Sequence, residues 1–111
     1  MHKLHIALAV KNLTTAVAEY TQRLGCEPVA IAKNRYALWR ADISNLSITQ
    51  DSKIAGTIRH IGFETQDIVG MVCEYDADGI EWEYFTAEQQ RLEIIKHYPD
   101  IDYPITSLKK E

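Results

Sequence analysis

The chain has little cysteine, no excess of positive charge and no long apolar run. Its two cysteines, Cys26 and Cys73, do not form a CxxC pair, so we expect reduced structural thiols and no disulfide framework. The net charge of −4 argues against nucleic-acid binding, which needs a basic surface. No segment reaches the length of a membrane span or resembles a signal peptide. These absences predict a cytoplasmic protein with neither a nucleic-acid nor a membrane partner.

Three motifs that often identify an enzyme are also missing from the sequence. It contains no nucleophile elbow, no glycine-rich phosphate loop and no HExxH segment. The composition is that of an ordinary globular protein, with 46% hydrophobic and 25% charged residues. A length of 111 residues suits one domain with one core, so we assign residues 1–111 to a single domain.

The sequence contains a weak internal repeat. The stretch HIALAVKNLTTAVAEYTQRLG, which begins at His5, aligns with HIGFETQDIVGMVCEYDADG, which begins at His60. Asn12 and Asp67 occupy equivalent positions, where a helix N-cap is expected, and a glycine follows each segment. Both copies carry apolar residues at i, i+3, i+4 and i+7: Leu13, Ala16, Val17 and Tyr20 in one, and Ile68, Met71, Val72 and Tyr75 in the other. We infer that residues 3–50 and 57–98 arose by duplication.

The repeat predicts an α+β fold, a tandem βαβββ-type arrangement whose second half is shortened. The first copy is expected to contain a helix at 12–24 and strands at 3–10, 28–32, 35–40 and 45–50. The second is expected to contain a helix at 67–77, on the same side of the sheet, and strands at 57–64 and 80–85. Residues 87–97 stay ambiguous: Thr86 and Gln89 form a capping box before a helix, but RLEIIKHY also suits a strand paired with IEWEYF.

Strand alternation places the two histidines on the less apolar face of the predicted sheet. His5 shares its face with Ala7 and Ala9, and His60 shares its face with Gly62 and Glu64. Ser47 lies on the polar face of its own strand. Small neighbours leave space above these residues, so the sequence predicts a pocket on a concave face that holds both imidazoles.

The segments HIALAVKNLTTAVAEYTQRLG and RHIGFE resemble the vicinal oxygen chelate superfamily, which includes glyoxalase I, bleomycin-resistance proteins and extradiol dioxygenases. The resemblance covers residues 3–98 and is weak after RHIGFE. It implies two partial barrels around a ligand pocket, often completed in a dimer. It also implies a divalent metal ion, such as zinc, manganese, iron or nickel, at the positions of His5, Ser47, His60 and Glu93.

Two histidines and a carboxylate would form a facial triad of His5, His60 and Glu93 that leaves coordination positions open. Ser47 cannot serve as the fourth ligand of a glyoxalase-type centre. The turn that precedes the last carboxylate in the family is also absent. If residues 87–97 are helical, Glu93 leaves the sheet, and the nearest substitutes are Glu64, Glu81 and Glu83.

Two functions follow from the resemblance. The one slightly favoured by the sequence is a metal-free, small-molecule-binding homodimer of the glyoxalase/bleomycin-resistance type. Its ligand would be bound by His5, His60, Ser47, Trp39, Trp82 and Tyr84. The alternative is a metal-dependent lyase or dioxygenase that acts on a substrate with vicinal oxygens. A homodimer is expected in either case because a shortened second half leaves sheet edges open.

Overall fold

The computed structural model describes residues 2–110 and contains one seven-stranded mixed sheet with two α-helices. The elements in chain order are β1 (Lys3–Val10), α1 (Leu13–Leu24), β2 (Ala30–Ala32), β3 (Tyr36–Arg40), β4 (Ser44–Gln50), the 3-10 turn η1 (Ser52–Ile54), β5 (Ile58–Glu64), β6 (Val72–Tyr75), β7 (Glu81–Phe85), α2 (Ala87–His97) and the 3-10 segment η2 (Ile105–Lys110). The strand order across the sheet is β2-β3-β4-β1-β5-β7-β6. The predicted α+β class is therefore confirmed.

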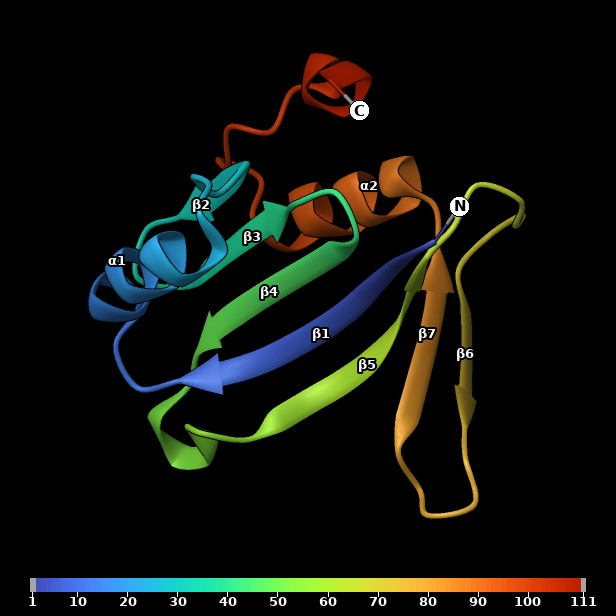
Figure 1. Ribbon diagram of the computed structural model, residues 1–111, viewed down its shortest axis with the longest axis horizontal. Coiled ribbons are helices and arrows are strands. Elements are labelled where there is room, and N and C mark those ends of the chain that lie inside the picture. Colours follow the sequence, from blue (N-terminus) through green and yellow to red (C-terminus); the bar gives the residue numbers. More distant parts are fainter. Residues whose placement is uncertain (1, 111) are drawn as a thin grey trace.

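The two halves of the chain meet at the centre of the sheet, where β1 and β5 pair antiparallel. On one side β1 pairs parallel with β4, and on the other β5 pairs parallel with β7. Figure 1 shows the strands as one strongly curved sheet, with the β6–β7 hairpin standing at one end. The first half has the predicted order βαβββ, but the second contains no helix before β7, so the tandem repeat is not confirmed.

The helix α1 begins and ends as its sequence predicts. The Asn12 side chain accepts a hydrogen bond from the Thr15 amide, and Gly25 closes the helix in the left-handed conformation (φ 75°) that glycine favours. Its buried residue Leu13 packs with Trp39 and Ile48 in a cluster on one face of the sheet. Burial of this apolar stripe stabilises the helix.

The segment at residues 87–97 is a helix, and it covers the opposite face of the sheet. The capping box of Thr86 with Gln89 is formed in both directions, which satisfies two backbone amides at the start of α2. Ile94 of this helix packs with Leu38, whereas the preceding and following residues of β3 face α1. Neither helix in the described part of the chain is long and apolar enough to cross a membrane.

The helix predicted at residues 67–77 is wrong. Residues Val72–Tyr75 form the edge strand β6, and the apolar stripe of the supposed helix is largely exposed to solvent. The Asp76 carboxylate accepts hydrogen bonds from the amides of Asp78 and Ile80, and Gly79 takes a positive φ of 82°. An Asp-Gly turn of this kind connects antiparallel strands, so the glycine taken as a helix C-cap belongs to a hairpin.

Candidate metal centre

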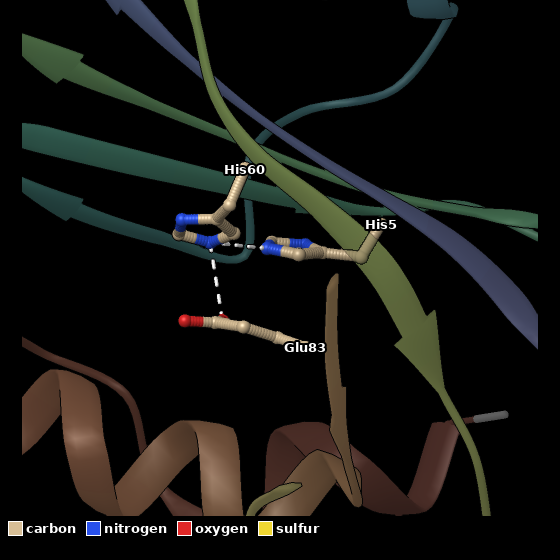
Figure 2. A group of neighbouring side chains, drawn as sticks. All are labelled: His5, His60 and Glu83. Carbon is tan, nitrogen blue, oxygen red and sulfur yellow. Dashed lines mark hydrogen bonds and ion pairs between the residues drawn. The ribbon is translucent and has the colours of Figure 1, made fainter. Parts of the chain in front are cut away.

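Three neighbouring strands bring two histidines and a carboxylate together on the face covered by α2. His5 of β1 pairs with Gly62 of β5, and Gly62 pairs with Glu83 of β7, so these residues form one row across the sheet. His60 lies two residues from Gly62 and therefore points to the same face. Figure 2 shows the three side chains directed toward one another, with a dashed line from His60 to each of the other two. We call His5, His60 and Glu83 the triad.

The polar atoms of the triad lie within reach of one small ion. His60 Nε2 is 3.0 Å from His5 Nε2 and 3.1 Å from Glu83 Oε1, and one ligand atom from each residue lies within 4.8 Å of the others. His5 is only 2% exposed, whereas the side chains of His60 and Glu83 are 15% and 20% exposed. The triad is thus buried at one end and open at the other.

The surroundings of the triad favour the protonation states that metal binding needs. Burial lowers the pKa of His5, which keeps that imidazole neutral near neutral pH. The hydrogen bond with His60 lowers the pKa of Glu83 in spite of partial burial, which keeps that carboxylate ionised. A neutral imidazole and an ionised carboxylate are the forms that coordinate metals.

A cavity of about 490 Å³ opens beside the triad, between the sheet and α2. Phe85 forms one wall and stands edge-on to the His5 ring, with ring centroids 4.9 Å apart. Ser47 and Gln90 add polar groups, and Arg59 contributes a positive charge. Arg59 lies at an irregularity in the pairing of β1 and β5, and such bulges often redirect a side chain next to a binding site.

The carboxylate beside the two histidines is Glu83 and not the predicted Glu93. Glu93 lies on α2 and lines the cavity, but its Oε1 is 3.7 Å from His97 Nδ1 and it is not part of the triad. If residues 87–97 are helical, the sequence predicts Glu64, Glu81 or Glu83 as substitutes. Of these, Glu83 joins the two histidines, Glu64 pairs with Arg40, and Glu81 accepts a hydrogen bond from the Cys73 thiol.

The ligand-binding residues predicted from the sequence divide between the two faces. His5, His60 and Ser47 line the cavity as expected. The three aromatic residues do not: Trp39 is buried against α1, and Trp82 and Tyr84 stack on Phe63 on the side of the sheet away from the triad. Alternation along β7 accounts for this, because Glu81, Glu83 and Phe85 share the cavity face and leave Trp82 and Tyr84 on the other.

A set of buried polar residues behind the triad was predicted only in part. Asn45 is fully buried, and its side chain contacts His5 and hydrogen-bonds to Glu64 and Gln90. Glu64 is in turn paired with Arg40. Strand alternation places Asn45 on the polar face of its strand and Glu64 on the face of His60. A further signal is Gln90, a polar residue four positions before the buried Ile94 on the same helix face. We call Arg40, Asn45, Glu64 and Gln90 the polar network.

Comparisons with known proteins give a fold but no family. No protein-family model matches the sequence, and a search of curated proteins finds no match. A solved structure described as an NAD-dependent benzaldehyde dehydrogenase from Legionella pneumophila superposes with a TM-score of 0.51 and 12% sequence identity. The match covers 75% of this chain and 97% of that one. At this level of identity the likeness concerns the fold alone.

Proposed function

We propose that the protein binds one divalent metal ion through His5, His60 and Glu83 and acts as a lyase or dioxygenase on a small substrate with vicinal oxygens. The observation that carries this proposal is the meeting of two imidazole nitrogens and one carboxylate oxygen at the wall of a cavity. A 2-His-1-carboxylate set leaves coordination positions open, and a bound zinc, manganese, iron or nickel ion would supply Lewis-acid or redox chemistry there.

The residues around the triad have separate roles in this proposal. Glu83 supplies a negative charge that offsets part of the charge of a divalent ion, and it is held by its pairing opposite Gly62. Phe85 shields His5 from water on one side. The Ser47 hydroxyl and the Arg59 guanidinium face the cavity, where they can hydrogen-bond to substrate oxygens and orient them.

A second candidate is the metal-free small-molecule-binding protein favoured by the sequence. One observation supports it: the His60 ring nitrogen already has partners in both other members of the triad, at 3.0 and 3.1 Å. A proton on this nitrogen satisfies the three groups without an ion. The triad would then be a set of polar groups that line the cavity and contact the ligand.

The experiment that separates these candidates measures metal content and metal affinity. Protein purified without chelator is analysed for bound metals, and the metal-free protein is titrated calorimetrically with Zn²⁺, Mn²⁺ and, under anaerobic conditions, Fe²⁺. We expect one ion per chain. Changes next to a metal ligand, but outside the ligand set, lower metal affinity by roughly 10–100-fold. The His60→Ala and Glu83→Gln variants should lose more affinity than this.

The matched control is Glu93→Gln. It makes the same change from carboxylate to amide in the same cavity, but outside the triad. This variant should bind the metal as the wild type does. No metal uptake by the wild type would refute the metal-dependent enzyme and leave the binding protein. Loss of affinity in Glu93→Gln with none in Glu83→Gln would show that the third ligand is misassigned.

A further inference from the structure

The polar network behind His5 is buried, and its hydrogen bonds determine which atoms of each amide face which partner. Asn45, Glu64 and Gln90 are 0%, 8% and 5% exposed. Buried polar groups at such positions are almost always hydrogen-bonded, because an unmade bond there is costly. The donor and acceptor roles in the network can therefore be worked out from one fixed point.

That fixed point is the Glu64 carboxylate. Arg40 donates two hydrogen bonds to it, from Nε to Oε1 at 2.9 Å and from Nη2 to Oε2 at 2.7 Å. A carboxylate bound in this way to a guanidinium only accepts hydrogen bonds. The Asn45 atom that lies 2.9 Å from Glu64 Oε1 must therefore be the amide nitrogen, Nδ2.

Gln90 takes its own orientation from that of Asn45. Asn45 Nδ2 donates to Gln90 Oε1 at 2.7 Å, and Gln90 Nε2 donates to Asn45 Oδ1 at 3.0 Å. This reciprocal pair would form equally with both amides turned over, so the Glu64 contact orients Asn45, and Asn45 in turn orients Gln90. It also attaches the first turns of α2 to the strand that carries Asn45.

The orientation of Asn45 settles the role of His5 Nδ1. This ring nitrogen lies 2.9 Å from Asn45 Oδ1 and 3.2 Å from the Asn45 backbone oxygen. Both neighbours are acceptors, so Nδ1 carries the hydrogen and donates it. In a neutral imidazole the lone pair is then on Nε2, the atom that points to His60.

We propose that Arg40, Glu64, Asn45 and Gln90 are positioning residues that select the His5 tautomer with its Nε2 lone pair directed into the triad. The use of this lone pair as a metal ligand rests on the proposed function, but the tautomer itself does not. A histidine that ligates a metal generally donates its other ring N–H to a fixed acceptor, which holds the ring and raises its basicity. Here the acceptor is an asparagine that is itself fixed by an ion pair.

The test begins with the metal-free wild-type protein. Two-bond ¹H–¹⁵N NMR correlations distinguish the two tautomers of a neutral histidine, and they are recorded at about pH 8, where unperturbed imidazoles are neutral. We expect His5 to be the Nδ1–H tautomer. Finding His5 as the Nε2–H tautomer would overturn the proposal whatever the variants do.

Two substitutions of Asn45 then separate selection of the tautomer from a general structural role. Asn45→Asp keeps an oxygen acceptor for His5 Nδ1 but loses both donated hydrogen bonds and places a second carboxylate near Glu64. Asn45→Leu replaces the side-chain acceptor by an apolar side chain of similar size. A purely structural role predicts that Asn45→Asp is the more damaging change for every property.

We expect the opposite order for the metal site. In Asn45→Leu only the longer contact of 3.2 Å with the backbone oxygen remains for Nδ1–H, so the Nε2–H tautomer of His5 should become detectable, and Zn²⁺ affinity should fall by about 10–100-fold. In Asn45→Asp the Nδ1–H tautomer should persist, with Zn²⁺ affinity near that of the wild type although the variant unfolds more easily. Equal loss of affinity in both variants would refute the proposal.

Failure of the proposed function gives a different result. If the wild type shows the Nδ1–H tautomer but takes up no metal, the positioning role stands and the metal-dependent enzyme does not. If the wild type binds metal but His5 of the metal-free protein is the Nε2–H tautomer, the metal site stands and the positioning role does not.

Discussion

Replacement of Glu64 by glutamine should destabilise the protein strongly, because Glu64 belongs to a buried ion pair. The Arg40 and Glu64 side chains are 3% and 9% exposed and are joined by two hydrogen bonds, with a third from Asn45 to the carboxylate. Glutamine has nearly the same shape, but it presents an NH₂ group where an oxygen accepts from Arg40. The buried guanidinium then loses the counter-charge of Glu64.

The size of the effect follows from the burial of this pair. Removal of one partner from a buried ion pair costs about 3–5 kcal/mol, a large share of the roughly 5–15 kcal/mol that stabilises a typical domain. At about 4 °C per kcal/mol for a domain of this size, the unfolding midpoint should fall by roughly 12–20 °C.

The loss should depend on pH in a defined direction. Burial raises the pKa of Glu64, but the hydrogen bonds from Arg40 and Asn45 outweigh it and hold the pKa below the ordinary value of 4.5. A carboxyl whose pKa is lower in the folded state stabilises the fold fully above its unfolded pKa, and this contribution is lost as the pH falls through the folded pKa. The difference between wild type and Glu64→Gln should therefore be constant near neutral pH and shrink below about pH 4.

Urea unfolding followed by circular dichroism and tryptophan fluorescence measures the difference. The matched control is Glu19→Gln, which removes the same charge from an i, i+4 pair with Arg23 whose side chains are 53% and 72% exposed. It should change the free energy of unfolding by about 0.5 kcal/mol or less. A loss below about 1 kcal/mol in Glu64→Gln, or a difference that persists unchanged at low pH, would refute this account of the ion pair.

Three further results are expected. In Gly62→Ala the added Cβ would collide with the Glu83 carbonyl oxygen, so β5 and β7 must separate. Calorimetry should show loss of metal binding, and unchanged binding would contradict the pairing of these strands. The Cys73 thiol donates a hydrogen bond to the Glu81 carboxylate at 2.7 Å, which raises the pKa of the thiol to about 11. Alkylation of Cys73 near neutral pH should therefore be slow in the wild type and faster in Glu81→Gln. Equal rates would exclude this contact. If the outer edge of β6 pairs with a second copy, light scattering should give a dimer for the wild type and a monomer for Val72→Lys, and a monomeric wild type would exclude the dimer.

The sequence predicted the first half of the fold well because its signals are local. Asn12 and Gly25 delimit α1, and alternating apolar residues mark the strands on either side of it. The repeat predicted that His5 and His60 lie close together, and the structure places their Nε2 atoms 3.0 Å apart. A weak repeat could thus locate a site where no single motif did.

The second half was harder to predict because two periodicities compete in it. Apolar residues in 67–77 have helical spacing, but a strand beside β7 pairs the backbone groups on the facing edges of the two strands. Asp76 and Gly79 form the turn between them. The ambiguity at residues 87–97 had a direct effect on the site. A helix there carries Glu93 off the sheet, and only the register of β5 with β7 brings Glu83 next to the histidines.

The central position of β1 has a consequence for how the chain folds. This strand is synthesised before its neighbours, yet its partners begin only at Ser44 on one side and Ile58 on the other. Until both have left the ribosome, a nascent chain exposes an apolar strand with two unpaired edges. Contacts so distant in sequence slow folding and prolong the time in which the chain can aggregate. The triad, which needs β1, β5 and β7, can be assembled only after most of the chain has been made, so any metal ion must be acquired late.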